Sequence, residues 1–299
     1  MSLRIGTRRS RLALAQANEI AARLGDSGVA TELVPIETSG DRGAPPTASP
    51  HGLKGLFVAE IVRALLDGEV DVAVHSAKDL PAEEAAGVVF GAVVRRETPF
   101  DVLVRHEAEL PGGAVVGTSS LRRRAQLLGA RRDVRVVDVR GNVDTRLAKL
   151  GSELDALVLA AAGLARLGVT PRYQTTLHAD EMVPAPGQGT LVVQVREGDA
   201  ETLRHVAVLE DPATRTTLSA ERALMARLGG GCSLPLGALA TMHGEAVHLT
   251  AVVATPDGQR IIRIDAEAGG PEQAADSAAE RLLRRGAGDI LRAVREAAV

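Results

Sequence analysis

The only cysteine of the 299-residue chain, Cys232, follows three glycines in the run Gly229-Gly230-Gly231-Cys232. A single cysteine cannot form an intrachain disulfide, and no CxxC or Cys/His spacing that would hold a metal accompanies it. The thiol is therefore either buried and inert or reactive. The flanking glycines leave its sulfur little covered, so that a ligand could approach it closely.

A second group of polar residues, His75, Ser76, Lys78 and Asp79, follows the expected strand at 71–74 in the run Val74-His75-Ser76-Ala77-Lys78-Asp79. Polar side chains at the C-terminal end of a strand are where α/β folds place their sites. A solvated Lys78-Asp79 pair and a structural His75 are the alternatives to a functional role. Pro81 fixes the turn and favours a defined loop.

Arginines gather where three expected strands lead into helices. The segments are Gly6-Thr7-Arg8-Arg9-Ser10, Gly117-Thr118-Ser119-Ser120-Leu121-Arg122-Arg123 and Arg140-Gly141-Asn142-Val143-Asp144-Thr145-Arg146. Cations are unfavourable at a helix N-terminus unless an anion binds with them, and the planar guanidinium suits carboxylates and phosphates. The alternative is an exposed arginine-rich face, because lysine is scarce and arginine supplies nearly all of the 35 cationic residues. The pattern indicates a small polyanionic ligand.

The elements that must position these residues alternate over the first two thirds of the chain. We expect strands at 3–5, 31–36, 71–74, 88–94, 102–104, 115–116, 134–139, 156–159 and 191–195, and helices at 10–24, 57–66, 120–128 and 143–150. Alternating strands and helices predict α/β sheets with parallel pairing. The segment 43–50 has no periodicity and is either a lid or a disordered connection.

The last part of the chain has a different pattern. Asp211-Pro212 begins an expected helix at 213–228, after which 247–254 and 260–266 form a predicted antiparallel hairpin around Pro256-Asp257-Gly258. Helices are expected at 272–284 and 289–297. This part is predicted to be a small separate α+β domain.

Composition excludes several classes of protein. A net charge of −3 gives no sign of a nucleic-acid or membrane partner, and 1% aromatic residues disfavour recognition of bases by stacking. The start of the chain has no apolar signal core, and no apolar run is long enough to span a bilayer. We therefore expect a cytoplasmic protein. No GxGxxG or Walker loop supports a nucleotide-binding transferase.

Taken together and in this order, the segments resemble the porphobilinogen deaminase family, also called hydroxymethylbilane synthases. The resemblance rests on the three arginine segments above, on the Lys78-Asp79 segment, and on Lys54-Gly55-Leu56-Phe57, Pro186-Gly187-Gln188-Gly189 and Gly230-Gly231-Cys232. It implies a transferase that joins four porphobilinogens head to tail, with release of ammonia, onto a dipyrromethane held by a cysteine thioether. Hydrolysis then frees hydroxymethylbilane, while the primer stays bound.

The resemblance also implies a role for each matching residue. Cys232 matches the cysteine that holds the cofactor, and Asp79 matches the catalytic carboxylate that stabilises the azafulvenium cation left when ammonia departs. The cofactor-binding matches are Lys78, Asp79, Ser120, Arg122, Arg123, Arg146 and Arg166, the substrate-binding matches are Arg8, Ser10, Arg140 and Arg146, and the lid matches are Lys54 and Phe57. No metal is implied.

The family's fold has two type-II periplasmic-binding-protein-like α/β lobes and a small α+β C-terminal domain that carries the cysteine. Transferred to this chain, residues 1–95 with 190–210 form the first lobe, 96–189 the second and 211–299 the C-terminal domain. The self-contained cleft of the family implies a monomer. The alternative is a non-catalytic two-lobe protein that binds a carboxylate ligand, which would need neither Asp79 nor Cys232.

Overall fold

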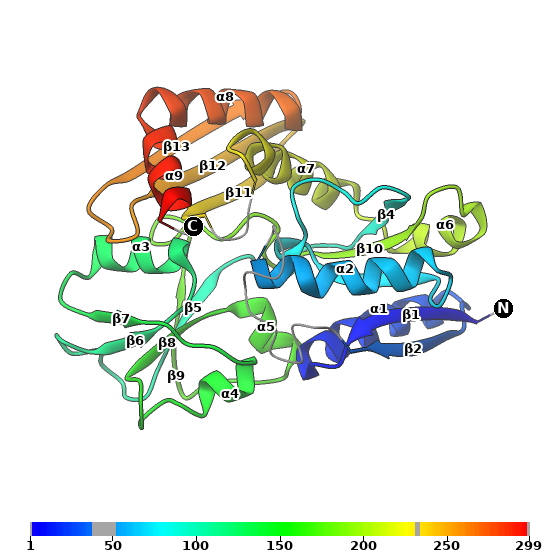
Figure 1. Cartoon of the computed structure of the whole chain (residues 1–299), viewed down its shortest axis with the longest axis horizontal. Helices are drawn as coiled ribbons and strands as arrows, with labels where there is room; N and C mark the ends of the chain where they lie inside the picture. The colour runs from blue at the N-terminus through cyan, green and yellow to red at the C-terminus, as the bar shows by residue number, and fades with distance from the viewer. Residues whose placement is uncertain (1, 38–51, 231–233, 298–299) are drawn as a thin grey trace. The chain divides into compact units, whose positions relative to one another are not determined.

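The computed structural model describes residues 2–37, 52–230 and 234–297 (Figure 1). Its chain forms two compact units. The first unit comprises Met1–Glu97 and Thr190–Arg215, and the second comprises Thr98–Gly189 and Thr216–Val299. The chain thus leaves the first unit and later returns to it, so that residues far apart in the sequence complete one sheet.

The first unit is built on a five-stranded mixed sheet. Its strands are β1 (Leu3–Arg8), β2 (Thr31–Ile36), β3 (Val72–Ser76), β4 (Val88–Val93) and β10 (Leu191–Arg196), in the spatial order β2-β1-β3-β10-β4. β1 is parallel to β2 and β3, whereas the returning strand β10 is antiparallel to β3 and β4. The carboxyl ends of β1 and β3 therefore meet at one edge of the sheet.

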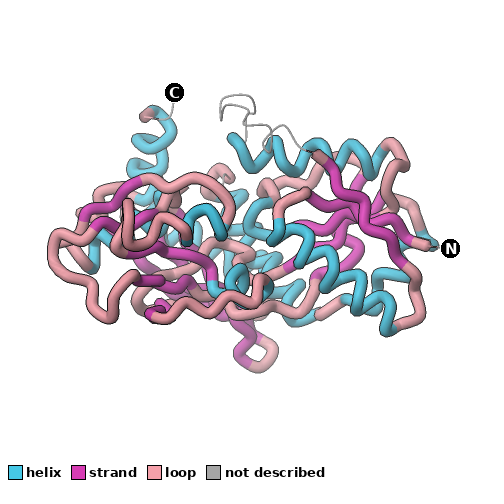
Figure 2. Tube along the Cα trace, turned by 90° about the horizontal axis from the view of Figure 1, so that it is seen from below, coloured by secondary structure: helices cyan, strands magenta, loops and turns pink. Residues whose placement is uncertain are grey.

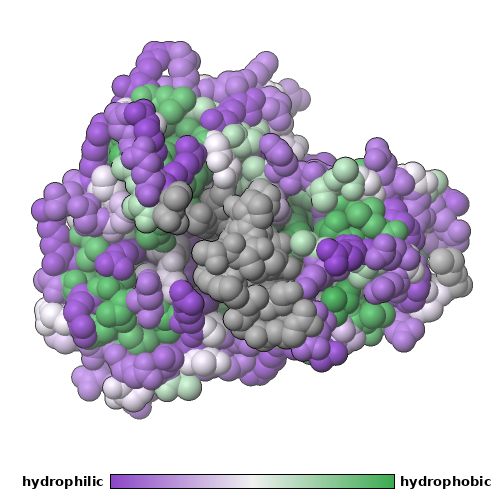
Figure 3. All heavy atoms as spheres, viewed as in Figure 1, coloured by the Kyte–Doolittle hydropathy of each residue, from purple (hydrophilic) through white to green (hydrophobic). Residues whose placement is uncertain are grey.

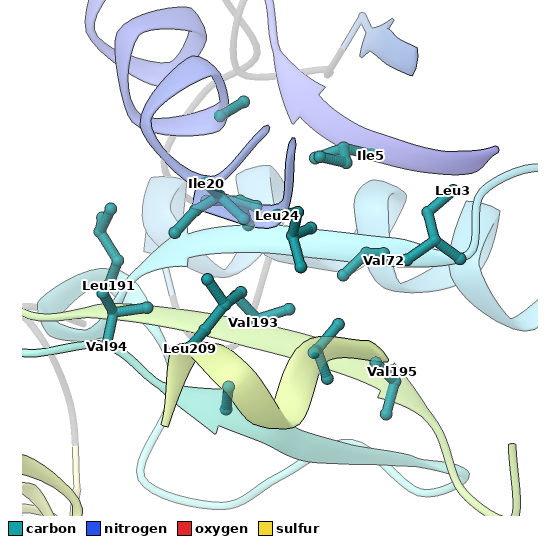
Figure 4. Packing of buried hydrophobic residues seen from close by; sticks show 14 residues of the cluster. Leu3, Ile5, Ile20, Leu24, Val72, Val94, Leu191, Val193, Val195 and Leu209 are labelled. Atoms are coloured by element: carbon teal, nitrogen blue, oxygen red, sulfur yellow. The ribbon is translucent and has the colours of Figure 1, made fainter. Parts of the chain in front are cut away.

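Helices cover both faces of this sheet (Figure 2). They are α1 (Arg11–Asp26), α2 (Gly52–Leu66) and α6 (Ala200–Val206), with the 3-10 turns η2 (Ala77–Asp79) and η3 (Ala207–Leu209). Ile20 and Leu24 of α1 pack with alternate residues of β1, β3 and β10, among them Ile5 and Val193, in one apolar core (Figure 4). Alternation places His75 of β3 on the opposite face of the sheet from Val74, which belongs to this core.

The second unit contains a sheet with the same spatial plan. Its strands are β5 (Asp101–Arg105), β6 (Val115–Gly117), β7 (Arg135–Val137), β8 (Ala156–Ala160) and β9 (Tyr173–Leu177), in the order β7-β6-β8-β5-β9. β6 is parallel to β7 and β8, and β5 is antiparallel to β8 and β9. The helices α3 (Leu121–Ala130), α4 (Val143–Leu147) and α5 (Ala161–Arg166) follow β6, β7 and β8 in turn.

A separate three-stranded antiparallel sheet completes the second unit. It consists of β11 (Leu236–His243), β12 (Ala246–Ala254) and β13 (Ile261–Ala268), with the helices α7 (Pro212–Arg227), α8 (Pro271–Arg284) and α9 (Ala287–Glu296). α8 buries small side chains such as Ala275 and Ala278 together with Leu282, and it contacts β12 and β13. On the face drawn in Figure 3, hydrophilic side chains and smaller hydrophobic patches share the surface over α8 and α9.

The structure confirms the predicted fold class, two α/β lobes and a small α+β part at the C-terminus, whereas the predicted parallel pairing is wrong for β10 and β5, which pair antiparallel with their neighbours. The sequence patterns missed α5, α6, β9 and β11. β9 is a mostly exposed edge strand of polar residues, and β11 is rich in alanine and glycine, which have low strand propensity. The division into three domains with the boundaries given above stays a prediction.

Candidate active site

Four of the predicted site residues lie at one edge of the first sheet. Arg8 is the last residue of β1, and Ser10 follows it as the N-cap of α1, where its Oγ accepts a hydrogen bond from the amide of Ala13 at 3.3 Å. Lys78 and Asp79 follow β3, the strand that pairs with β1. All four side chains are partly exposed. The structure therefore brings together two cations and one carboxylate at the carboxyl ends of adjacent strands.

The turn that holds Lys78 and Asp79 is fixed by backbone hydrogen bonds. The amide of Ala77 donates to the carbonyl of Thr190 at 3.0 Å, and the amide of Leu80 donates to the carbonyl of Ala77 at 3.2 Å. Ala77 and Leu80 are buried on either side of the two charged residues. Lys78 and Asp79 are thus anchored at both ends by buried neighbours, which orders this loop.

His75 is a buried residue just before this turn. Burial lowers its pKa to about 4, and the nearby charge of Asp79 offsets only part of that effect. Its Nε2 has no hydrogen-bond partner among the described residues. The imidazole is therefore neutral at neutral pH, which agrees with the structural role that we considered for it.

The second sheet presents further predicted residues at the corresponding edge. Ser120 caps α3, and its Oγ accepts a hydrogen bond from the amide of Arg123 at 3.4 Å. Ser119 ties the loop to the end of the neighbouring strand, because its Oγ donates to the carbonyl of Val139 at 2.8 Å and accepts from the amide of the same residue at 3.0 Å. A Cβ on Gly117 would lie 2.7 Å from side-chain atoms of Leu154 and Leu157, so this close approach requires glycine.

Arg122 and Arg123 are buried and share one carboxylate, that of Asp101. Arg122 Nη1 lies 2.6 Å from Asp101 Oδ2, and Arg123 donates to Asp101 Oδ1 through Nε at 2.9 Å and contacts it through Nη2 at 2.7 Å. Arg122 also donates to the carbonyl of Val183, and Arg123 to that of Val158. We name Asp101, Arg122 and Arg123 the second-unit triad.

The charges of the triad depend on one another. Burial by itself raises the pKa of Asp101, but Arg122 and Arg123, with a hydrogen bond from Gln188, lower it well below its usual range. Burial lowers the pKa of Arg122, and Asp101 opposes this change. Asp101 is therefore ionised at neutral pH, and because arginine side chains keep their proton in proteins, the triad has a net charge of one positive unit.

The turn at 186–189 connects the triad to other parts of the second unit. Gln188 Nε2 donates to Asp101 Oδ1 at 3.0 Å and to the carbonyl of Pro99 at 2.7 Å. Arg166 Nη2 donates to the carbonyl of Gly189 at 3.1 Å. The buried carboxylate of Glu221 on α7 accepts from the amide of Gly187 at 2.6 Å. Arg166 is thus brought to the same turn as Asp101.

Arg140 and Arg146 flank the start of α4. Arg140 is exposed and has no hydrogen bond or ion pair among the described residues. Arg146 Nε donates to the carbonyl of Gly141 at 2.8 Å and closes the short loop before α4. Gly141 has a φ of 107°, and this left-handed backbone conformation favours glycine.

Three predicted residues lack a described side chain. Cys232 lies outside the described residues, and Lys54 and Phe57 belong to α2 but their side chains are outside the described part of the chain. The roles of all predicted site residues stay predictions.

Within residues 2–37, 52–230 and 234–297 no cluster of metal-ligating side chains occurs. No helix in those ranges is both long enough and apolar enough to cross a bilayer.

The sequence patterns missed two residues that contact the predicted site residues of the second unit: Asp101, which binds Arg122 and Arg123, and Gln188, which binds Asp101. Gln188 stood in a recognised segment without a role, and Asp101 had no motif of its own. One signal could have found Asp101: it is an acidic residue at the start of a buried strand, with no neighbouring cation in the sequence. A buried carboxylate needs a partner, so arginines from elsewhere had to reach it.

Both sheets are α/β sheets with arginines at or just after the carboxyl ends of their parallel strands, and the first sheet also has the carboxylate of Asp79 at that edge. Family models for porphobilinogen deaminase match almost the whole chain. The model for the dipyromethane cofactor binding domain matches residues 3–204, and that for the C-terminal domain matches residues 215–284. The chain belongs to the porphobilinogen deaminase family.

Two relatives with the family's name agree with this assignment. The chain is 47% identical over 301 residues to a porphobilinogen deaminase of Pelotomaculum thermopropionicum, covering 98% of this chain and 96% of the relative. It is 44% identical over 298 residues to that of Brevibacillus brevis, covering 96% of each. Among solved structures, a periplasmic substrate-binding protein of an ABC transporter from Coxiella burnetii aligns with 71% of this chain and 94% of its own, at 17% identity and a TM-score of 0.42.

Proposed function

We propose that this protein is a transferase that joins four porphobilinogen molecules head to tail, with loss of one ammonia at each step, into hydroxymethylbilane. A covalently bound dipyrromethane serves as its primer. The observation that carries the proposal is the carboxylate of Asp79 beside Arg8 and Lys78 at one sheet edge, in a chain whose two parts match this family.

The residues present fit the dipyrromethane. Each pyrrole ring brings two carboxylates, and the second unit offers arginines and a capping serine at the ends of its parallel strands. We assign the tether to Cys232 and the binding of the primer's carboxylates to Lys78, Ser120, Arg122, Arg123, Arg146 and Arg166. When bound, the dipyrromethane supplies the pyrrole carbon to which the first porphobilinogen is joined.

Asp79 is proposed to act in the step in which ammonia leaves porphobilinogen. Loss of ammonia from porphobilinogen leaves a positive charge spread over the pyrrole and its exocyclic carbon. A carboxylate fixed by a rigid turn stabilises that developing charge more than reorienting water does. The same oxygens accept hydrogen bonds from pyrrole N–H groups. Asp79 is therefore proposed to orient the ring and to stabilise the cation.

Arg8, Ser10, Arg140 and Arg146 are proposed to bind the acetate and propionate groups of the incoming porphobilinogen. A guanidinium binds a carboxylate through two parallel hydrogen bonds, which fixes orientation as well as position. Arg140 is exposed and has no other ion pair among the described residues, so its charge is available to a ligand. Holding both reactants in one orientation removes much of the entropic barrier to joining them.

The test measures turnover of porphobilinogen by the purified full-length protein. Ammonia release and the absorbance of the product are the two readouts. We expect activity in the wild type, and a loss of about 10²- to 10³-fold in kcat for Asp79→Asn, since a neutral amide cannot stabilise a cation. Cys232→Ser is expected to carry no primer. An unmodified, inactive wild type would instead favour the non-catalytic carboxylate-binding protein.

We also propose, from the family resemblance, that the protein acts as a monomer in the cytoplasm and binds no nucleic acid. Sedimentation velocity at micromolar concentration measures the first property directly. A dominant species at the mass of the 31.1 kDa chain is expected, and a concentration-dependent dimer would contradict it.

A further inference from the structure

Arg122 and Arg123 occupy consecutive positions in the first turn of α3. Side chains at consecutive positions of a helix leave the axis in directions about 100° apart and do not face each other. Both guanidinium groups nevertheless reach the two oxygens of Asp101, at 2.6 and 2.9 Å. Asp101 therefore sets the direction of both side chains.

The two arginines need the Asp101 carboxylate as a counter-charge because of where they lie. Asp101, Arg122 and Arg123 expose 0%, 4% and 9% of their side chains, so little water reaches the charges. The first turn of a helix also disfavours cations, because the partial charge of the helix is positive there. Without Asp101 two buried guanidinium groups at this helix end would repel each other and would turn away from their present directions.

The arrangement leaves the buried Nε of Arg122 without an acceptor among the described residues. Each of the three nitrogens of Arg123 has an acceptor, namely Asp101 for Nε and Nη2 and the carbonyl of Val158 for Nη1. An unpaired buried donor on a charged group is unfavourable, and a carboxylate is the acceptor that guanidinium groups prefer.

The first unit contains a matched arrangement. Asp71 is bound by Arg4 at 2.8 Å and by Arg196 at 3.4 Å, and we name these three residues the first-unit triad. It lies where β3 begins and β10 ends, at the opposite edge of its sheet from Arg8 and Asp79. None of its members is a candidate site residue. Substitution of Asp71 therefore controls for the loss of a carboxylate between two arginines.

We propose that Asp101 is a positioning residue, which directs Arg122 and Arg123 so that the pair binds a carboxylate of the primer. This inference rests on the proposed function and adds a residue to it. Asp101 does not touch the reacting atoms. Its carboxylate balances one of two positive charges and fixes the two guanidinium groups, while Gln188 donates to Oδ1, the oxygen that Arg123 also contacts.

The experiment compares Asp101→Asn with Asp71→Asn and the wild type, each as full-length protein. The amount of bound dipyrromethane per chain is measured by colour with Ehrlich's reagent, and KM and kcat for porphobilinogen are measured on the same samples. We expect Asp101→Asn to carry about tenfold less primer than the wild type, since misdirected arginines bind their carboxylate poorly. Asp71→Asn is expected to carry as much primer as the wild type.

The loaded fraction of Asp101→Asn distinguishes positioning from stability alone. We expect it to have a raised KM with less change in kcat, whereas a merely structural role would change neither constant in folded, loaded protein. Equal primer content and equal KM in Asp101→Asn and the wild type would overturn the inference. A wild type without primer would instead overturn the proposed function, so the two failures are distinguishable.

If Asp101→Asn does not accumulate as folded protein, Asp101→Glu decides the question. Glutamate keeps the charge and moves the carboxylate by one methylene. We expect folded protein with primer content between those of Asp101→Asn and the wild type. Primer content and KM equal to those of the wild type in Asp101→Glu would overturn the inference.

Discussion

The two triads have the same chemistry and different surroundings. In each, one buried aspartate lies between two arginines, and its pKa is lowered below the usual range. Arg4 and Arg196 of the first-unit triad expose 40% and 26% of their side chains, whereas Arg122 and Arg123 expose 4% and 9%. The first-unit triad joins β1, β3 and β10 where β3 begins, and the second-unit triad lies where β6 and β8 end.

The residue types of an ion pair therefore do not determine its role. At the edge where the parallel strands begin, the arginine and carboxylate charges are satisfied by each other and by Asp199 and backbone carbonyls. At the edge where they end, the helices α3, α4 and α5 begin, and the buried Nε of Arg122 has no acceptor among the described residues. The position in the α/β fold, more than the residue types, separates support of the sheet from binding of a ligand.

The largest expected difference between the triads is in stability. Asp101→Asn leaves two buried guanidinium groups without a counter-charge and is expected to lower the free energy of unfolding by about 3–5 kcal/mol. Asp71→Asn is expected to lower the free energy of unfolding by less, because water solvates the partly exposed Arg4 and Arg196. Urea unfolding of both variants at pH 7 measures the difference. An equal loss in the two variants would contradict the contrast in burial.

The pH dependence of the free energy of unfolding also distinguishes the triads, but the contribution of His75 must first be separated from theirs. The unfolded chain binds a proton at this histidine below about pH 6.5, whereas the folded chain does so only below a pKa of about 4. The free energy of unfolding should therefore fall as the pH falls from 6.5 to 4, by about 3 kcal/mol, and this contribution should not change further below that pH.

Both triads should respond to acid only at lower pH. Their aspartates have lowered pKa values in the folded protein, so their stabilisation is complete above the ordinary aspartate pKa and is lost as the pH falls below it. Urea unfolding of wild type and His75→Gln from pH 7 to pH 3 separates the two ranges. His75→Gln should lose the change between pH 6.5 and 4. Retention of that change would assign it to another group.

A smaller effect on stability is expected from the serines that cap one helix at each of the two sheet edges. Ser10 caps α1 in the first unit and Ser120 caps α3 in the second, each by accepting one backbone hydrogen bond. Replacement of either serine by alanine is expected to cost about 1 kcal/mol. Thermal unfolding measures both. A much larger cost for Ser120→Ala would show that the cap also holds Arg122 and Arg123 in place.

The smallest expected effect is that of salt. Screening acts on exposed charges and hardly on buried ones. The stability difference between wild type and Asp71→Asn is therefore expected to shrink in 1 M salt, about ten times the usual ionic strength, whereas that for Asp101→Asn should persist. Urea unfolding at the two salt concentrations checks this. Equal salt sensitivity in both variants would contradict the difference in exposure.

Much of this fold could be predicted from the sequence, because apolar alternation and capping residues are local signals. The junctions at Ser10 and Ser120 were predicted for this reason. Asp101 could not be predicted as a partner of Arg122, since 21 positions separate them and only the pairing of β5 with β8 brings them together. Burial of Arg122 and Arg123 was also not visible, because a basic cluster at a helix start is typical of an exposed face.

The most direct test of this account is the intact mass of wild type, Asp71→Asn and Asp101→Asn proteins purified side by side from one host. We expect wild type and Asp71→Asn to exceed their sequence masses by two linked pyrrole units, and most Asp101→Asn chains not to do so. Full modification of Asp101→Asn, or loss of the added mass from Asp71→Asn, would contradict it.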